Sequence, residues 1–492
     1  MWRDWRVAPQ LHLEWGSTMS GSREITRERD VNHRPRAHFI GVGGAGMSGI
    51  ALVLHARGAV VSGSDIRASR YTDALERAGV AVSIGHNAAH LHDPEVVVVS
   101  TAIPETNPEL LEARRRGIEV WPRARMLAHL AEDRTVVAVA GTHGKTTTSS
   151  MIATMLAGVG LDPTFLVGGE LAQFGTNAAA GGGPHYVVEA DESDGSFLFL
   201  EPDVAVITNV EADHLDHYGC LERIEDTFVE FITRVRSSGT VVVCADDARL
   251  MELARRHSAV PLLSYGTEEH ANVRIADLVP EGQGTRFSVE LPGGRRVQTR
   301  IKAPGVHNAL NATAALAAAF ALNLDPISAG EVLKDFGGVR RRFDEIGVID
   351  GVTVVDDYAH HPTEVRATLK AASGLGFRRV WAVFQPHRFS RTEALSHEFG
   401  AAFDDADRVV LLDVYGAGET PIPGVTGHAV VDAVMRQRPR TNLAWLPHRA
   451  DVTRFMIPRL RPGDLVLTMG AGDVTNLGPE LVRELEAVAG GS

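Results

Sequence analysis

Short apolar runs alternate with glycine turns and helix-like stretches along most of the chain. Residues 37–42 form an apolar run, and residues 43–49 form a glycine-rich turn that opens a helix. Residues 96–100 are a continuous β-branched run, which is typical of a strand buried on both faces of a parallel sheet. This alternation predicts a small doubly wound α/β domain, closed by helices at 113–116 and 121–132.

The same pattern starts again at Thr135 and a third time after a glycine break at 336–338. Within the second unit, residues 286–301 alternate and contain a Pro-Gly-Gly turn, which predicts a β-hairpin. We therefore predict an α/β protein with three domains. They are an N-terminal Rossmann-like domain (37–134), a central domain with a parallel sheet and a small β-hairpin portion (135–338), and a C-terminal Rossmann-like domain (339–492).

Composition and charge narrow the classes of function. The net charge of −13 argues against general binding to nucleic acid or to anionic membranes, and no apolar run is long enough to span a bilayer. The only two cysteines, Cys220 and Cys244, favour a reducing cytoplasm. Residues 1–36 are polar and Arg-rich, so we interpret them as a disordered extension, with Met19 as another candidate start.

The first glycine turn has the spacing of a nucleotide-binding loop. Gly41, Gly43 and Gly46 form a G-x-G-x-x-G pattern after an apolar run. Glycines allow the backbone to approach a pyrophosphate, and the following helix N-terminus favours its negative charge. Asp65 follows at a distance compatible with a ribose contact. The residues alone leave open NAD, a UDP-sugar and a purely structural turn.

The second glycine turn carries a stronger signal. Gly141-Thr-His-Gly144-Lys145-Thr146 lies between an apolar strand and a helix, which is the context of a P-loop. Backbone N–H groups of such a turn hold phosphate oxygens, Lys145 neutralises them, and the Thr146 hydroxyl binds Mg²⁺. The usual motif has a glycine six residues before the lysine, where this chain has Val139, so the loop is shorter.

Acidic residues at strand ends are candidates for holding the metal. Glu189 ends an apolar run, and a carboxylate at the carboxyl end of a parallel strand faces the ligand crevice. We interpret Asp203 and Glu211 as solvent-facing charges. A zinc site is a further possibility by composition, formed from Asp213, His214, Asp216 and His217. Such tight spacing in a loop makes it hard to place all four on one ion, which disfavours zinc.

Together these motifs resemble the Mur ligases, the amino-acid-adding enzymes of peptidoglycan synthesis. The matching segments are GTHGKTT at 141–147, EADESD at 189–194, TNVEADH at 208–214, HNALNA at 307–312, RRRFDE at 340–345 and DDYAHHPT at 356–363. The resemblance extends from about residue 37 to the end of the chain and covers all three expected domains.

The resemblance implies an ATP-dependent, ADP-forming ligase that activates a carboxylate as an acyl phosphate and joins it to an amino acid. The segments 41–51, 384–392 and 413–419 resemble the branch that adds L-alanine to UDP-N-acetylmuramate. The first glycine loop then binds UDP and not NAD. The alternative within the family is a ligase that recycles murein peptides by attaching a tripeptide.

The resemblance also implies the site residues. Those expected to bind ATP are Gly141, Thr142, His143, Gly144, Lys145, Thr146, Thr147, Asn308 and Asn311. Those expected to bind the UDP part are Gly43, Gly44, Gly46, Ser64, Asp65, Thr101 and Ala102. Those expected to bind the amino acid are Tyr358, His361, His387, Arg388 and Arg391. Catalysis is assigned to Lys145, His214, Arg342, Asp356 and Asp357, and Mg²⁺ or Mn²⁺ to Thr146, Glu189 and His214.

A site shared between domains predicts that the C-terminal domain closes when ATP binds, with a hinge at Gly337 and Gly338. We further expect a cytoplasmic monomer or weak homodimer that binds no nucleic acid and does not insert into membranes. Two rival hypotheses are an NAD-dependent oxidoreductase and an ATPase that ligates nothing. The first leaves the P-loop unexplained, and the second predicts ATP turnover without any amino acid.

Overall fold

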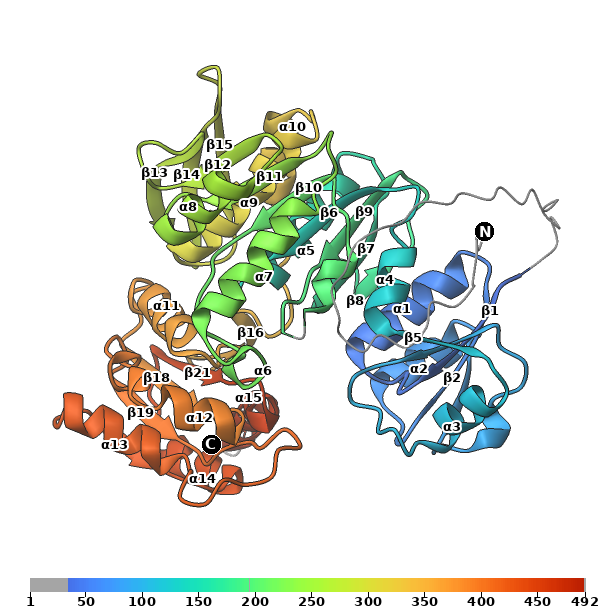
Figure 1. Cartoon of the computed structure of the whole chain (residues 1–492). Coiled ribbons are helices and arrows are strands. Elements are labelled where there is room, and N and C mark those ends of the chain that lie inside the picture. Colours follow the sequence, from blue (N-terminus) through green and yellow to red (C-terminus); the bar gives the residue numbers. More distant parts are fainter. Residues whose placement is uncertain (1–33, 194, 491–492) are drawn as a thin grey trace. The chain divides into compact units, whose positions relative to one another are not determined.

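The computed structural model describes residues 34–193 and 195–490, which form two compact units (Figure 1). The first unit contains the chain up to Asp133 together with Ala178–Gly182. The second contains Arg134–Asn177 and the chain from Gly183 onward. The expected extension at 1–36, apart from its last three residues, and the candidate start at Met19 lie outside the described residues.

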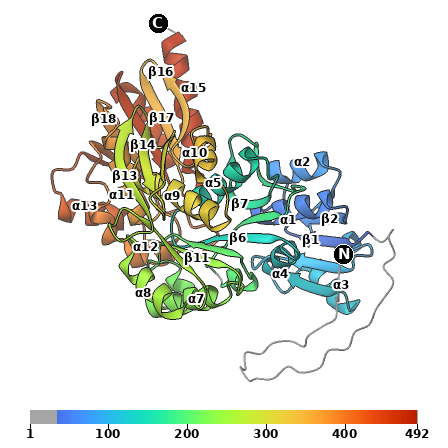
Figure 2. The same ribbon diagram turned by 90° about the horizontal axis from the view of Figure 1, so that it is seen from above.

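The N-terminal sheet has five parallel strands in the order β3-β2-β1-β4-β5. The strands are β1 (Arg36–Ile40), β2 (Val60–Asp65), β3 (Ala81–Ile84), β4 (Val96–Val99) and β5 (Glu119–Pro122). The helices are α1 (Ala45–Ala56), α2 (Arg70–Arg77), α3 (Pro108–Arg115) and α4 (Arg123–His129), and α1 lies against α2 (Figure 2). The strand order reverses between β1 and β4, which is where doubly wound sheets bind ligands.

Two expectations about this domain were wrong in detail. The sequence pattern missed β3, whose four residues show no clear alternation. Residues 121–132 do not form a single helix, because Trp121 and Pro122 end β5 and α4 starts at Arg123. Trp121 is buried against the sheet, as its β-propensity would favour, and Pro122 is the N-cap residue of α4.

The central sheet has the order β15-β14-β13-β12-β11-β10-β6-β9-β7-β8. Its strands are β6 (Thr135–Ala140), β7 (Thr164–Leu171), β8 (Thr176–Ala179), β9 (His185–Glu189), β10 (Val204–Ile207), β11 (Thr240–Cys244), β12 (Leu262–Gly266), β13 (Val273–Glu281), β14 (Gly284–Glu290) and β15 (Arg296–Ile301). The pairs from β13 to β7 are parallel, whereas the pairs β13–β14 and β14–β15 are antiparallel. The predicted hairpin is therefore β14–β15, and β13 adds a third strand to it.

Helices cover both faces of the central sheet (Figure 2). They are α5 (Lys145–Gly158), α6 (Leu215–Tyr218), α7 (Leu221–Thr233), α8 (Ala248–His257), α9 (Val306–Ala321) and α10 (Pro326–Leu333). The alanines of α9 are almost all buried, and α5 and α9 pack against each other. Small side chains allow this close approach of the helix that follows the P-loop and the helix that carries Asn308 and Asn311.

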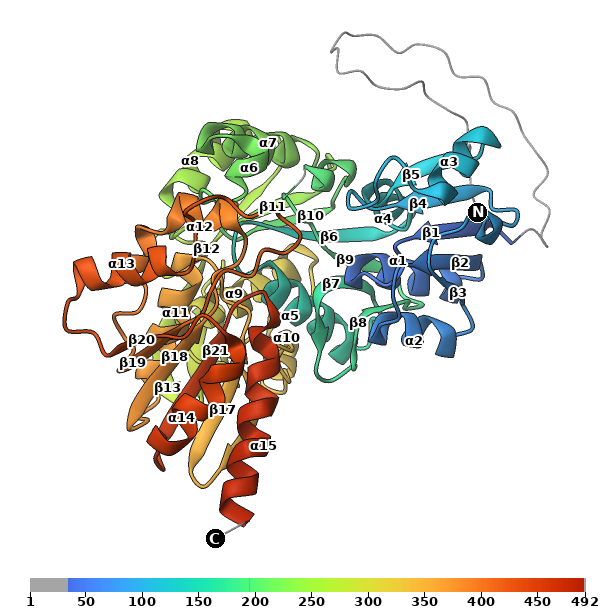
Figure 3. The same cartoon turned by 90° about the horizontal axis from the view of Figure 1, so that it is seen from below.

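The C-terminal sheet has the order β16-β17-β21-β18-β19-β20, with only β16 antiparallel to its neighbour. Its strands are β16 (Asp344–Ile349), β17 (Val352–Asp357), β18 (Arg379–Phe384), β19 (Arg408–Leu411), β20 (Leu443–Trp445) and β21 (Asp464–Met469). Its helices are α11 (Pro362–Ser373), α12 (Phe389–Leu395), α13 (His428–Gln437), α14 (Val452–Met456) and α15 (Leu477–Gly490). Helix α15 runs along β16 and β17 (Figure 3).

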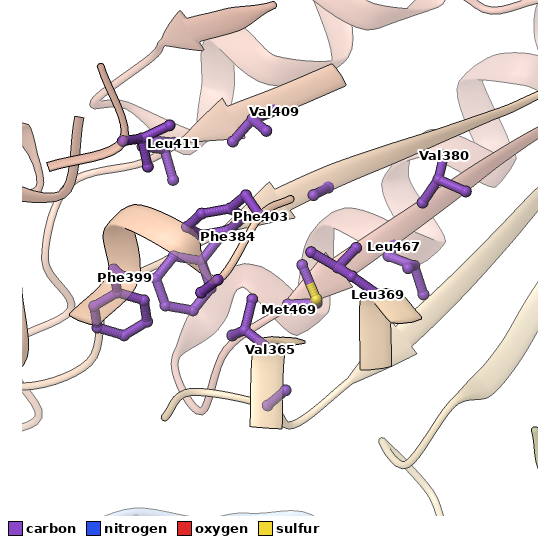
Figure 4. Close-up of a cluster of buried hydrophobic side chains, with 14 of the residues drawn as sticks. Val365, Leu369, Val380, Phe384, Phe399, Phe403, Val409, Leu411, Leu467 and Met469 are labelled. Carbon is purple, nitrogen blue, oxygen red and sulfur yellow. The ribbon is translucent and has the colours of Figure 1, made fainter. Parts of the chain in front are cut away.

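A cluster of buried apolar side chains, three of them phenylalanines, covers one face of the C-terminal sheet. Phe384 at the end of β18 packs against Phe399 and Phe403, with Leu467 and Met469 of β21 in the same cluster (Figure 4). All five are almost fully buried. The cluster fixes the end of β18, from which the segment 385–392 emerges.

The connection between the central and C-terminal sheets begins as an addition to β7. The Ala172 N–H donates to the Gly338 carbonyl at 3.2 Å, the Arg340 N–H donates to the Glu170 carbonyl at 2.9 Å, and Val339 bridges to β7. Of the two expected hinge glycines, Gly338 is therefore itself pinned through its carbonyl, and Gly337 stands just before it. Among the described residues, no helix is both long and apolar enough to cross a bilayer.

Candidate active site

Strand β6 leads directly into the P-loop, whose shape requires glycine at two positions. Gly141 and Gly144 have φ angles of 128° and 83°. A Cβ atom at Gly141 would lie 2.1 Å from Thr208 Oγ1, and one at Gly144 would lie 2.6 Å from Asn311 Oδ1. Helix α5 starts at Lys145, so its free N–H groups and positive dipole end face the loop.

Lys145 is held across the P-loop by a carboxylate to which the sequence interpretation gave no role. Its Nζ donates to the Gly141 carbonyl and to Glu192 Oε1, both at 2.7 Å. Burial raises the pKa of Glu192 to about 7, against the opposing effect of Lys145. The pKa of Lys145 is itself raised, because the carboxylates of Glu192 and Asp191 outweigh its burial. In the sequence, the indication that Glu192 belongs to the site was its position three residues after Glu189.

Two of the three predicted metal ligands lie side by side. Thr146 Oγ1 is 3.0 Å from Glu189 Oε1, and the Gly168 N–H donates to the other carboxylate oxygen at 2.6 Å. A hydroxyl and a carboxylate are the oxygen donors that Mg²⁺ prefers. His214 follows Asp213 in the loop after β10, with a φ of 52°. Burial lowers the pKa of His214, so its ring is neutral and retains a lone pair for a metal.

Of the candidate zinc residues noted in the sequence, the three whose side chains the structure describes do not gather as one set of metal ligands. Asp213 pairs instead with Arg391 at 3.0 Å, and the His217 ring packs edge-on against Tyr218. The side chain of Asp216 lies outside the described residues. Asp213 therefore serves an ion pair between the loop after β10 and α12.

A different trio gathers beside the P-loop, formed by His143, Glu211 and His361, whose possible ligand atoms lie within 4.8 Å of one another. His361 caps α11, because its Nδ1 accepts the Thr363 N–H at 3.3 Å. Its proton is then on Nε2, which is buried without a partner. In this arrangement His361 presents an N–H and no lone pair, so the trio fits hydrogen bonding to an anion better than binding of a metal.

A cavity of about 520 Å³ lies next to the P-loop, a size suited to a nucleotide. Its wall includes His143, Gly144 and Thr147 from the P-loop side, His307, Asn308 and Asn311 from α9, and Arg342, Asp357 and Glu364 from the C-terminal domain. Burial lowers the pKa of His307 to about 4, so this ring is neutral. Asn311 Oδ1 accepts the Thr148 hydroxyl, which fixes one amide of the cavity wall.

Glu364 is the charged centre of the C-terminal wall and was also missed. Its Oε1 lies 3.3 Å from His143 Nδ1 and 3.7 Å from a guanidinium nitrogen of Arg342. Its other oxygen accepts the backbone N–H groups of His360 and His361. Although burial raises its pKa, these positive and donor groups hold it well below its usual range. The three-residue spacing of a capping box was the signal that could have identified it.

The interpretation of Glu211 and Asp203 as solvent-facing charges was wrong. Glu211 Oε2 accepts the Thr363 hydroxyl at 2.8 Å and lies 3.6 Å from His143 Nε2. Asp203 accepts the Val136 N–H at 2.8 Å and pairs with Arg236. Glu211 thus connects the central domain to α11, and Asp203 braces the start of β6.

The neighbouring aspartates of β17 face opposite sides of the sheet, as successive strand residues must. Asp357 lines the cavity and accepts the N–H groups of Phe343 and Ala359, both at 2.8 Å. Burial raises its pKa to about 6. Asp356 points the other way, where it accepts the hydroxyls of two threonines and pairs with Arg341.

The predicted amino-acid residues divide into a connected group and two outliers. Tyr358 lies beneath the guanidinium groups of Arg341 and Arg342, and its ring is 5.3 Å from that of His360. His360 in turn is 5.9 Å from His387, which lies 3.4 Å from Arg391. The outliers are Arg388, whose guanidinium lies 3.8 Å from Glu419, and His361, which faces His143.

The predicted UDP residues share the carboxyl edge of the N-terminal sheet. Gly43 donates its N–H to Asp65 Oδ2 at 2.8 Å, so the carboxylate holds the glycine loop. A Cβ atom at Gly43 would lie 2.8 Å from that oxygen, and one at Gly46 would lie 2.7 Å from Arg123. Ser64 is buried in β2, while Gly44, Thr101 and Ala102 are exposed beyond β1 and β4.

Three family models match consecutive parts of the chain. "Mur ligase family, catalytic domain" matches residues 36–135, "Mur ligase middle domain" matches residues 139–319, and "Mur ligase, glutamate ligase domain" matches residues 341–472. Together they cover most of the chain.

Known proteins resemble the chain over nearly its whole length. A UDP-N-acetylmuramate–L-alanine ligase of Thermobifida fusca (strain YX) is 48% identical, over 94% of this chain and 99% of the relative. The enzyme of the same name from Geotalea daltonii is 46% identical, over 92% and 98%. Among solved structures, a UDP-N-acetylmuramate-alanine ligase from Thermotoga maritima superposes with a TM-score of 0.77 at 29% identity, over 92% of this chain and 99% of that one. A murein peptide ligase from Psychrobacter arcticus gives 0.69 at 25%, over 91% and 98%.

Proposed function

This chain belongs to the Mur ligase family, and on that premise we propose that it joins L-alanine to the carboxylate of UDP-N-acetylmuramate. The reaction consumes ATP and gives UDP-N-acetylmuramoyl-L-alanine, ADP and phosphate. The observation that carries the proposal is 48% identity to a ligase of this name over 94% of the chain. The P-loop and the adjoining cavity supply the matching chemistry, a place for a nucleotide beside groups that stabilise a transferring phosphoryl group.

The chemistry must turn a carboxylate, which is a poor electrophile, into an amide. An oxygen of the substrate carboxylate attacks the γ-phosphorus of ATP. The bond between the γ-phosphorus and the oxygen that joins it to the β-phosphorus breaks. ADP departs, and the carboxylate has become an acyl phosphate. Positive groups in a dry cleft stabilise the charge on the transferring group. Lys145 supplies one such charge, and Arg342 supplies another from the C-terminal wall. Thr146 and Glu189 would hold Mg²⁺, which would supply further positive charge beside the phosphates.

The second step needs the amino acid held with its amine toward the acyl phosphate. The amine attacks the carbonyl carbon, the bond to the phosphate oxygen breaks, and a proton leaves the nitrogen. Arg391 lies next to His387, which suits a carboxylate clamp. Burial lowers the pKa of His387 to about 4 and that of His360 to about 3, so both rings are neutral and accept a hydrogen bond from the amine.

Several finer assignments belong to the same proposal. The domain boundaries are taken as 37–134, 135–338 and 339–492, with ATP in the central domain and the amino acid in the C-terminal one. Mg²⁺ or Mn²⁺ is the proposed ion, and His214 is its third ligand. The murein tripeptide ligase is not favoured, because the solved murein peptide ligase from Psychrobacter arcticus gives a TM-score of 0.69, against 0.77 for the alanine ligase from Thermotoga maritima.

The decisive experiment measures phosphate release from ATP and Mg²⁺ in the presence of UDP-N-acetylmuramate. L-Alanine, glycine, L-serine and a murein tripeptide are tested separately. We expect release that requires the UDP-sugar and is fastest with L-alanine. If release is fastest with the tripeptide, the protein is a murein-recycling ligase. If release depends on neither the UDP-sugar nor the amino acid, the protein hydrolyses ATP without ligation, and the proposal is wrong.

A further inference from the structure

A fully buried carboxylate lies beneath the carboxyl edge of the N-terminal sheet. Glu109, in the first turn of α3, is 0% exposed. Its oxygens accept the Ser64 hydroxyl, the Asn87 N–H at 2.9 Å, His38 Nε2 at 3.2 Å and His90 Nδ1 at 3.1 Å. A charge so far from water is retained only where donors satisfy it. Here the donors come from β1, from β2 and from the segment 86–90.

These donors also decide the charge of Glu109. Burial raises its pKa, but the hydrogen bonds from His38, Ser64 and the Asn87 amide outweigh burial and lower the pKa to about 2. Glu109 is therefore an anion at neutral pH and can only accept. His38 must direct its Nε2–H, and His90 its Nδ1–H, toward the carboxylate.

Ser64 transmits this arrangement to the glycine loop. Its carbonyl accepts the Gly41 N–H at 2.8 Å and the Val42 N–H at 2.9 Å. Its hydroxyl gives its proton to Glu109 and lies 3.0 Å from His86 Nδ1, from which it accepts. Ser64 is thus fixed from both sides, by the loop on its backbone and by Glu109 on its side chain.

We propose that Glu109 is a positioning residue for the UDP part of the substrate. It holds Ser64 and the segment 86–90 in the arrangement that lets the glycine loop and Asp65 receive a nucleotide diphosphate. It acts only through these groups, because its own side chain is closed off from any ligand. The inference rests on the proposed function, in which the N-terminal sheet binds the UDP-sugar.

Glu109→Gln is the sharpest test, because it preserves shape while replacing one acceptor oxygen by an NH₂ group. That group would face N–H and O–H donors, and at least one of them would lose its partner. We expect the KM for UDP-N-acetylmuramate to rise at least tenfold. The KM for ATP and the kcat at saturating UDP-sugar should stay within twofold of the wild-type values.

Glu119→Gln is a matched control at the opposite edge of the same sheet. Glu119 is also mostly buried and accepts the indole N–H of Trp121, but it lies at the amino end of β5. A general weakening of the domain would raise the KM equally in both variants and would overturn the inference. An unchanged KM in Glu109→Gln, despite a normal melting temperature, would also overturn it.

A double-mutant cycle with Ser64→Ala tests the path of the effect. If Glu109 acts through Ser64, the two KM increases will not multiply in the double variant; if they do multiply, that path is refuted. His90→Gln serves if Glu109→Gln does not fold, and the same KM-only change is expected in smaller size. No KM change in His90→Gln would then count against the proposal. Wild-type protein that releases no phosphate with UDP-N-acetylmuramate would refute the proposed function instead.

Discussion

At the scale of single residues, the Lys145 side chain of the P-loop is already held by hydrogen bonds in the absence of a phosphate. Lys145 spans its own loop and donates to Glu192, whose second carboxylate oxygen is buried and has no partner among the residues that the structure describes. Incoming phosphate oxygens would compete with Glu192 for the same ammonium group. The lysine is therefore held near its working position, but by contacts that a phosphate can replace.

Lys145→Met should reduce the rate of phosphate release at least a hundredfold, because one preorganised cation in a dry cleft is lost. The assay is phosphate release with ATP, UDP-N-acetylmuramate and L-alanine. Lys334→Met is the matched control, since Lys334 lies in the same domain and pairs with Glu331 away from the P-loop. Activity of Lys145→Met within tenfold of wild type would contradict the role given to this lysine.

Residue types and spacing were enough to predict the P-loop, the pairing of Thr146 with Glu189, and the glycines at the edge of the first sheet. They were not enough for Glu364 or Glu109. The partners of Glu364 come from the P-loop and from the linker, and the partners of Glu109 come from β1, β2 and a loop. Such contacts depend on how distant segments pack. The capping-box spacing could have marked Glu364 as a helix-start residue, but not its contacts with His143 and Arg342.

At the scale of elements, alternation along strand β17 separates two adjacent aspartates that the sequence could not tell apart. The sequence placed a strand there, but it did not say which face meets the cavity. That depends on the pairing of β17 with β16 and β21, which comes from the whole sheet. In the N-terminal domain the sequence missed β3 and β5, which are short and border the sheet, where patterning is weak. In the central domain it missed β7 and β13, which are longer and lie inside the sheet.

Asp357→Asn and Asp356→Asn should therefore have different effects. Asp357→Asn should raise the KM for ATP or lower kcat by tenfold or more, with a small change in stability. Asp356→Asn should cost about 2 kcal/mol of unfolding free energy, because two hydroxyl donors and Arg341 lose a charged acceptor. Kinetics and urea unfolding distinguish the two, and a reversed pattern would show that the face assignment is wrong.

The contact of the P-loop with α11 should depend on pH through His143. Burial lowers its pKa, but the carboxylates of Glu211 and Glu364 outweigh this and raise it to about 9. Because the unfolded value is about 6.5, the folded state holds the proton more tightly. The resulting stability, of about 3 kcal/mol at most, is present below pH 6.5 and is lost as the pH rises to about 9.

Urea unfolding of wild-type protein and His143→Gln at pH 6.5 and at pH 9 measures this effect. The difference in unfolding free energy between the two proteins should shrink as the pH rises. His270→Gln is the control, since His270 is exposed in the same domain. If the difference in unfolding free energy is the same at both pH values, folding does not raise the pKa of His143, and the prediction is wrong.

At the scale of the molecule, the central and C-terminal domains meet through polar and charged contacts. Arg391 pairs with Asp213, Thr363 donates to Glu211, and His143 meets Glu364. Interfaces of this kind exchange partners more readily than apolar ones, and each of these groups lies near a proposed substrate. The substrates can therefore take over contacts that now join the domains.

We predict that a non-hydrolysable ATP analogue with Mg²⁺ and UDP-N-acetylmuramate makes the protein more compact, because charged ligands draw Arg342 and Arg391 toward the P-loop. Small-angle scattering with and without these ligands measures the change. Lys145→Met under the same conditions should show a smaller change. Identical scattering curves for the wild-type protein with and without ligands would rule out closure.

The linker that is pinned to β7 has a thermodynamic consequence. The same strand carries Gly168, whose N–H donates to Glu189. The start of the linker, residues 338–340, and the carboxylate proposed to bind the metal are therefore held by one strand. Ala172→Pro removes the N–H that donates to the Gly338 carbonyl. Titration with Mn²⁺, followed by electron paramagnetic resonance, should then show weaker binding of the ion. An unchanged affinity would show that the linker contact and the metal site are independent. Binding free energies are reciprocal. If the cation favours one position of the C-terminal domain, then holding the domain in that position raises the affinity for the cation by the same factor.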